Sequence, residues 1–235
     1  MKPFSFTGLT TDFLSLFYPS VCAACSHDLR KGESVLCIRC RYQLPRTGYM
    51  LQSGHTLERL FHGRAKLIGA TALFHYIKGS GVQRLVHHLK YNGRKDVGTF
   101  AGKMLAERWS EFPEALQPHV VIPVPLYHMK MKQRGFNQAE EVSGGFASVM
   151  NISHLPDALI RIQESGTQTL RHRYERFTSM DGIFKLKRKE ELAGKKVLLV
   201  DDVITTGATL ISCAEALADV PNIELMIGAI AVARR

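Results

Sequence analysis

The most constraining feature of this sequence is the polar segment 201–209, which reads Asp-Asp-Val-Ile-Thr-Thr-Gly-Ala-Thr. An unbroken apolar run, 197–200, precedes it, and a stretch with a helical pattern of apolar residues, 210–218, follows it. This order predicts a buried strand that ends at two carboxylates and turns into a helix. Ligands of α/β folds bind at such strand ends.

The chemistry of this turn suits a phosphorylated pentose. Small hydroxylated residues and a glycine let the backbone wrap around a phosphate, and the N-terminus of the next helix adds positive potential. The two carboxylates would repel a phosphate, but they accept hydrogen bonds from ribose hydroxyls. We therefore expect a ribose 5-phosphate site, with an ordinary strand-to-helix turn as the alternative. The candidate ligands are Asp201, Asp202, Thr205, Thr206, Gly207, Ala208 and Thr209.

Strand-like and helical patterns alternate along the rest of the chain. Strands are expected at 67–76, 120–122, 158–162, 197–200 and 225–232, and helices at 80–89, 96–109, 137–149 and 210–218. The alternation predicts an α/β fold with a mainly parallel sheet and helices on both faces. Pro123 and Pro125 end the second strand, because proline cannot continue a central ladder. Their turn is expected at the same rim of the sheet as Asp201.

Four cysteines near the N-terminus form two Cys-x-x-Cys pairs. They are Cys22, Cys25, Cys37 and Cys40. This spacing predicts one tetrahedral zinc site in a small head, whose folding the metal would support. Two disulfides or redox dithiols are the alternative. Cys213 stands among apolar residues, which suggests a buried structural thiol.

Composition narrows the function classes further. The 235 residues include 31 basic and 21 acidic ones, a formal charge of +10 that favours polyanionic partners. No apolar stretch approaches the roughly 20 residues of a membrane span, and the segment 1–19 lacks the features of a secretory signal, so a cytoplasmic location is expected. The apolar residues of 13–17 suggest a docking helix rather than a membrane anchor.

Three further motifs sharpen this interpretation. They are Leu-Lys-Tyr-Asn-Gly-Arg at 89–94, Pro-Val-Pro-Leu at 123–126 and Arg-Gly-Phe-Asn-Gln-Ala at 134–139. Together with the four-cysteine head and the 201–209 turn, they resemble the ComF family of competence-associated, phosphoribosyltransferase-like proteins. The resemblance runs from about residue 14 to the end. Lys130 and Lys132 stand where family members commonly carry arginine, and lysine lacks the planar fork that binds phosphate through two hydrogen bonds.

The resemblance implies a type I phosphoribosyltransferase-like fold over 61–235 and an N-terminal helix with a zinc-ribbon-like head over 1–60. It implies that the 201–209 turn binds phosphoribosyl diphosphate (PRPP) with Mg²⁺, and that Asp201 and Asp202 are the catalytic pair. The turn at 123–126, with Val124 and Pro125, is expected either to present backbone N–H groups to the pyrophosphate or only to end the strand. Arg134 is expected to reach phosphate oxygens, and Lys90, Tyr91 and Arg94 are expected along the wall of the pocket. Asn137 either reaches a phosphate or caps the following helix.

A role in uptake or utilisation of DNA follows from the same resemblance, with PRPP or a related nucleotide, single-stranded DNA and the DNA-uptake machinery as expected partners. One hypothesis is phosphoribosyl transfer with release of pyrophosphate. The alternative is a non-catalytic module that binds single-stranded DNA and uses the fold as a sensor, and a third is a zinc-headed structural adaptor. The candidate nucleic-acid contacts are Arg171, Arg173, Arg176, Lys130 and Lys132.

Overall fold

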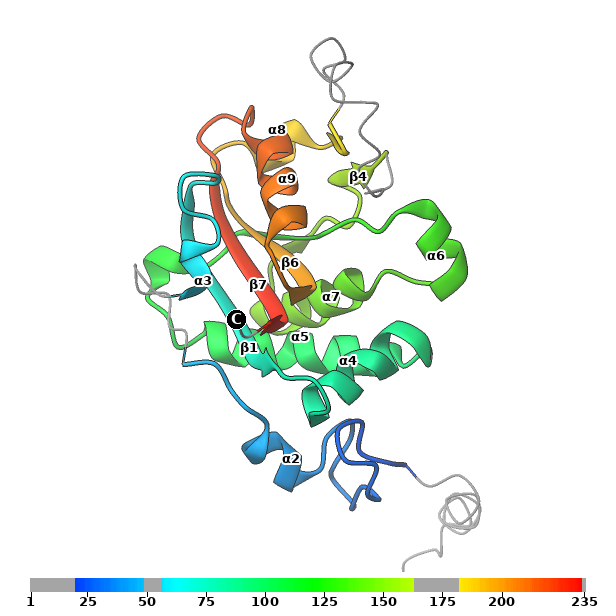
Figure 1. Cartoon of the computed structure of the whole chain (residues 1–235). Helices are drawn as coiled ribbons and strands as arrows, with labels where there is room; N and C mark the ends of the chain where they lie inside the picture. The colour runs from blue at the N-terminus through cyan, green and yellow to red at the C-terminus, as the bar shows by residue number, and fades with distance from the viewer. Residues whose placement is uncertain (1–19, 49–55, 163–181, 234–235) are drawn as a thin grey trace, which may run out of the picture.

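The structure is a computed structural model that describes residues 20–48, 56–162 and 182–233 (Figure 1). At its centre lies a five-stranded sheet in the order β1-β7-β6-β2-β3, in which all neighbours are parallel. The strands are β1 (Leu67–Tyr76), β2 (Val120–Pro123), β3 (Ser153–His154), β6 (Lys196–Ile204) and β7 (Glu224–Ala233). The predicted mainly parallel sheet is therefore confirmed.

Both faces of this sheet are covered by helices, as the alternation predicted. Successive residues of β6 show this directly: Val197 and Leu199 belong to one apolar layer, and Leu198 and Val200 belong to the other. Side chains alternate between the two faces of a strand, so an unbroken apolar run indicates burial on both. The helices α4 (Gly81–Tyr91), α5 (Lys95–Trp109) and α7 (Gln138–Met150) supply the first layer, and α3 (Thr56–Arg59) and α9 (Ala208–Leu217) supply the second.

Local sequence explains where two of these helices begin. The Ser80 hydroxyl accepts a hydrogen bond from the Gln83 N–H at 3.4 Å and caps α4, whose buried residues recur at helical spacing. The Asn137 side chain accepts from the Ala139 N–H at 3.1 Å and caps α7. Of the two roles expected for Asn137, the structure shows the cap.

Glycines let α5 and α7 pack closely. A Cβ atom on Gly102 would lie 2.0 Å from the Val142 carbonyl oxygen, and one on Gly145 would lie 2.2 Å from the Thr99 carbonyl oxygen. Any side chain at these positions would force the two backbones apart. Helices α5 and α7 pack together in the same apolar layer as α4 and one face of the sheet.

Shorter elements surround the sheet. They are α2 (Ile38–Gln43), η1 (Glu114–Leu116), α6 (His128–Arg134), α8 (Lys189–Leu192), β4 (Leu159–Arg161) and β5 (Phe184–Leu186). The strand expected at 158–162 is present as β4, but it pairs antiparallel with β5 outside the main sheet. The edge position beside β2 belongs instead to β3, which the sequence analysis did not anticipate.

The cysteine head is docked on the sheet and on α4. Segment 45–47 runs along the outer edge of β1: the Thr47 N–H donates to the Leu73 carbonyl at 3.0 Å, and the His75 N–H donates to the Pro45 carbonyl at 2.8 Å. From α4, the Arg84 Nε donates to the Ala24 carbonyl at 2.6 Å. Head and sheet thus share one apolar layer.

The expected division at residue 60 stays a prediction. Leu57 and Phe61, on either side of it, are both buried in the second apolar layer. Within the residues that the structure describes, no helix combines the length and the apolar character that a bilayer crossing needs. The docking helix expected near residues 13–17 lies outside the described residues.

Candidate functional site

A cavity of about 550 Å³ opens at the carboxyl ends of β2 and β6. Five parts of the fold line it: the end of β1, one side of α4, the turn after β2 with α6 and the start of α7, the end of β4, and the turn from β6 into α9. The predicted residues Val124, Pro125, Lys130, Arg134, Asp201, Asp202, Thr205 and Thr209 are among its lining.

The acid pair lies near the end of β6, which continues to Ile204 rather than stopping at the acids. The Asp202 N–H donates to an Asp201 carboxylate oxygen at 2.8 Å, and Lys90 Nζ lies 3.0 Å from Asp202 Oδ1. Burial, reinforced by the charge of Asp202, raises the pKa of Asp201 to about 7. Asp201 therefore keeps a proton to higher pH than an ordinary aspartate does.

The loop after β6 has the features of an anion site. Gly207 adopts a left-handed conformation (φ 77°), and a Cβ atom there would lie 3.2 Å from the Phe61 ring, so the turn requires glycine. As the N-cap of α9, Gly207 has no side chain to accept the first helical N–H groups. The Thr205 and Thr206 side chains are exposed, and Thr205 and Thr209 face the cavity. Gly207 and Ala208 provide backbone at the helix start, where phosphates bind.

The turn after β2 offers fewer donors than the resemblance implies. The Val124 N–H donates to the Val200 carbonyl at 2.8 Å and is used by the sheet. Pro123 and Pro125 have no N–H, so Leu126 holds the remaining one. The Val124 carbonyl in turn accepts from the Asn137 side chain at 3.1 Å, which ties the turn to α7. Contact of Val124 and Pro125 with pyrophosphate stays a prediction, and it would not use their backbone N–H groups.

Cations surround the acid pair. The described lining contains the lysine and arginine side chains Lys90, Lys130, Arg134 and Arg161. Arg134 donates to the Gln138 side chain at 2.8 Å, and its guanidinium lies 5.5 Å from the centre of the Tyr91 ring. Lys132 and Arg94 are not among the lining residues: Lys132 is exposed, and Arg94 pairs with Asp96 at 2.7 Å. The remaining predicted contacts, Arg171, Arg173 and Arg176, lie outside the described residues.

Sequence reasoning missed Arg161 and His87, which also line the cavity. Arg161 is the last residue of β4, and its charge lowers the pKa of Asp201, against the larger effect of burial. The position of Arg161 near the end of a predicted strand could have identified it as a candidate ligand contact. His87 carried none, because its place beside Tyr91 depends on how α4 packs.

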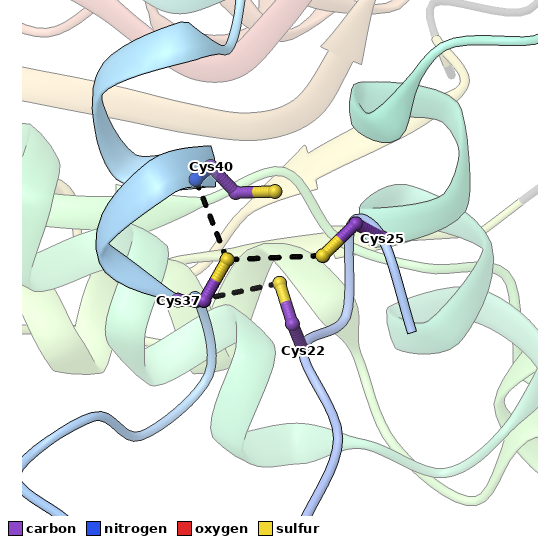
Figure 2. A group of neighbouring side chains, drawn as sticks. All are labelled: Cys22, Cys25, Cys37 and Cys40. Carbon is purple, nitrogen blue, oxygen red and sulfur yellow. Dashed lines mark hydrogen bonds between the residues drawn. The ribbon is translucent and has the colours of Figure 1, made fainter. Parts of the chain in front are cut away.

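The four cysteines converge in the head, as their spacing predicted (Figure 2). All four sulfur atoms lie within 4.8 Å of one another, and Cys25 Sγ and Cys37 Sγ are 3.7 Å apart. Tetrahedral zinc with Zn–S bonds of about 2.3 Å separates its sulfurs by about 3.8 Å, so the donor set fits zinc. Each Cys-x-x-Cys pair supplies one side of the cluster. Cys213 is fully buried apart from it, and burial raises the pKa of its thiol.

Backbone hydrogen bonds also prepare one thiolate of this cluster. Burial raises the pKa of Cys22, but hydrogen bonds from the backbone, the largest from Cys37, outweigh it and lower the pKa to about 7. The Cys37 N–H donates to Cys22 Sγ at 3.3 Å. Burial and the neighbouring thiols instead raise the pKa of Cys40. A bound cation would favour the thiolate form throughout the cluster.

Comparison with known proteins places this geometry in a class. Residues 135–234 match the family model of the phosphoribosyl transferase domain. The chain is 27% identical over 205 residues to Competence protein F of Haemophilus influenzae, covering 83% of this chain and 89% of that protein. It is 25% identical over 207 residues to DNA utilization protein YhgH of Escherichia coli O157:H7, covering 87% and 86%. It is also 36% identical over 91 residues to Competence protein ComFC of Bacillus subtilis, covering 39% and 35%.

The parallel sheet, the acid pair and the loop at the start of α9 define a type I phosphoribosyltransferase-like protein. The four-cysteine cluster precedes this domain on the same chain. Together with the similarity to the competence and DNA utilization proteins, these features support a ComF-like, phosphoribosyltransferase-like protein.

Proposed function

We propose that the cavity binds PRPP or a related ribose 5-phosphate nucleotide, and that the protein acts in uptake or utilisation of DNA. The observation that carries the first part is that one cavity is lined by the acid pair and by Thr205 and Thr209 at the start of α9, whose N-cap, Gly207, makes no side-chain hydrogen bond. Ribose hydroxyls suit the acids, and a 5′-phosphate suits the helix start. The second part is supported by the names of the relatives, a competence protein and a DNA utilization protein.

Two cationic side chains of the cavity could balance the negative charge of the diphosphate. PRPP carries a diphosphate at C1′ in addition to the 5′-phosphate. Lys130 and Arg134 lie on the α6 side of the cavity, across from the turn into α9. Arg134 is already oriented by Gln138 at 2.8 Å, so little of its conformational freedom remains to be lost on binding.

Magnesium fits the donor chemistry of the same cavity. Carboxylate oxygens of Asp201 and Asp202, together with ligand oxygens, are the hard donors that this ion prefers. When bound, Mg²⁺ would neutralise diphosphate charge and make pyrophosphate a better leaving group. The acid pair would orient the ribose, and the start of α9 would fix the 5′-phosphate.

Phosphoribosyl transfer is the reaction that this arrangement suits. The acceptor's nitrogen lone pair would form a bond to C1′ while the bond from C1′ to the pyrophosphate oxygen breaks. Pyrophosphate would leave with the electron pair, and the acceptor nitrogen would lose its proton. The protein's contribution would be positioning and electrostatic stabilisation of a cation-like transition state.

Calorimetric titration with PRPP and Mg²⁺ tests binding. We expect a saturable heat for the wild type and its loss in the double variant Asp201→Asn/Asp202→Asn. The matched control is Asp219→Asn, which removes an exposed carboxylate at the far end of α9 and should bind as the wild type does. Equal binding by all three proteins would contradict the proposal. Release of pyrophosphate with a panel of bases and amines then tests transfer.

A non-catalytic, DNA-binding module remains the second candidate function. It is favoured by the formal charge of +10 and by exposed cations beside the cavity, such as Lys132. Single-stranded DNA binding should then weaken steeply with salt and on changing Arg171, Arg173 and Arg176 to alanine. Binding that is insensitive to both would exclude this function.

A further inference from the structure

Tyr91, the last residue of α4, lies at the mouth of the cavity. Its side chain lines the cavity, yet the residue is 63% exposed. Aromatic side chains commonly bury most of their area, and an exposed ring beside a ligand cavity is available for stacking. Tyr91 follows directly on Lys90, the residue that contacts Asp202 at 3.0 Å. Tyr91 and both acids line the same cavity.

Two neighbours contact this ring, and the residue nevertheless stays mostly exposed. The His87 ring, one turn earlier on α4, has its centre 4.9 Å from that of Tyr91 at a tilt of 46°. The Arg134 guanidinium lies 5.5 Å from the ring centre and is itself anchored by buried Gln138. A ring fixed from two elements presents a flat surface whose orientation is set before a ligand arrives.

The groups that line the cavity suit the parts of a nucleotide. The loop at Thr205–Thr209 suits the phosphate, the acid pair suits the ribose, and the end of α4 meets the acid pair through the contact of Lys90 with Asp202. In a nucleoside 5′-phosphate the base is attached to C1′, at the opposite end of the ribose from C5′. With the phosphate at α9, the base would point toward Tyr91.

We propose that Tyr91, held by His87 and Arg134, is the stacking platform for the base of a nucleotide. The inference rests on the proposed function of the cavity and narrows its ligand to a pentose 5′-phosphate that bears a base. Two sources offer this chemistry: a free nucleoside monophosphate and the 5′-phosphorylated end of a single DNA strand. A sequence-tolerant platform suits either one, because every base has a flat face.

The experiment compares ligands with and without a base on matched proteins. Adenosine 5′-monophosphate and ribose 5-phosphate are titrated into the wild type, Tyr91→Ala and Tyr91→Phe. Tyr42→Ala is the control, because Tyr42 is 75% exposed on the cysteine head, away from the cavity. We expect Tyr91→Ala to weaken the nucleotide about tenfold or more while ribose 5-phosphate changes less than about twofold. Tyr91→Phe and Tyr42→Ala should match the wild type.

The outcomes separate this proposal from the function on which it rests. If Tyr91→Ala weakens the binding of both ligands equally, or of neither, Tyr91 is not a stacking platform. The proposal that the cavity binds a ribose 5-phosphate is unaffected by that result. If the wild type binds neither ligand, the platform is excluded, and the titration with PRPP and Mg²⁺ decides the proposed function separately. An equal affinity of the wild type for the two ligands would also overturn the platform, because the base would then contribute nothing.

Oligothymidylates with a 5′-phosphate or a 5′-hydroxyl identify the source. Binding that needs both the 5′-phosphate and Tyr91 supports the platform with a DNA end as ligand. If only the binding of the mononucleotide depends on Tyr91, the result supports the platform with a free nucleotide as its ligand. An oligonucleotide that loses affinity in Tyr91→Ala but is indifferent to the 5′-phosphate contradicts the proposed order of groups.

Discussion

Lys90 Nζ lies 3.0 Å from Asp202 Oδ1, with both side chains largely withdrawn from water. This contact joins the end of α4 to the end of β6 across the cavity and balances part of the charge of the acid pair. The two carboxylates are adjacent in sequence and buried together, an arrangement that costs free energy unless cations or ligands compensate.

Replacing Lys90 should therefore destabilise the protein. We expect Lys90→Met to lower the free energy of unfolding by about 1–3 kcal/mol at pH 8, because an ionised carboxylate loses its charged partner. The control is Lys95→Met, since Lys95 is more exposed and pairs with Glu141 at 3.6 Å, and such pairs contribute about 0–1 kcal/mol. Urea denaturation measures both, and equal effects would contradict the role given to Lys90.

Replacing Asp201 should raise the stability of the protein at high pH and weaken its binding of PRPP. Its pKa is about 7 in the folded protein against an ordinary value of 3.8, so the folded state holds a proton that the unfolded state releases. Stability from this proton is full below pH 3.8 and is lost as the pH rises through 7. Asp201→Asn does not titrate, so it should be more stable than the wild type at pH 8 but bind PRPP more weakly.

Thermal unfolding from pH 5 to pH 8 checks this prediction. The difference in melting temperature between Asp201→Asn and the wild type should grow with pH. A constant difference would mean that Asp201 is ionised throughout.

Removal of zinc should destabilise the whole chain as well as the cysteine head. Ala23, Ala24 and Leu36 are buried in the same apolar layer as residues of α4 and α5, so loss of the metal should lower the melting temperature of the whole chain. Elemental analysis should find one zinc per chain in the wild type and none in Cys40→Ser. Cys213→Ser is the matched control, because this buried thiol lies outside the cluster, and it should retain its zinc.

Two neighbouring glycines of α7 should respond in opposite directions to alanine. A Cβ on Gly144 would meet its nearest atom, on the His154 ring, at 3.6 Å, which is an ordinary contact. Gly144→Ala should stabilise the protein by up to about 1 kcal/mol through helix propensity. Gly145→Ala should destabilise it by more than about 2 kcal/mol, because the new atom would overlap the Thr99 carbonyl. Denaturation of the two variants side by side tests the close approach of α5 and α7.

The parts of the site that sequence predicted are those made by consecutive residues. The acid pair, Gly207 and the threonines follow one strand, so their proximity to one another needs no tertiary information. The cysteines are similar, because two short turns bring their thiols together. The alternation of elements likewise predicted the parallel sheet and its two helical layers.

The rest depended on contacts between distant segments. Lys90 and Arg161 reach the acid pair from α4 and from β4, and the pairing of β4 with β5 outside the main sheet has no local signature. In the turn after β2, an expected binding group is instead used by the fold. The family resemblance implies a phosphate-binding backbone there, yet the Val124 N–H donates to the sheet.

The backbone hydrogen bonds of Thr47 and His75 place segment 45–47 along an outer strand of the sheet. An uncovered strand of this kind can recruit the same strand from another molecule. The cysteine head therefore covers this edge of the sheet, and protein that has lost zinc should self-associate through the strand edge that becomes exposed.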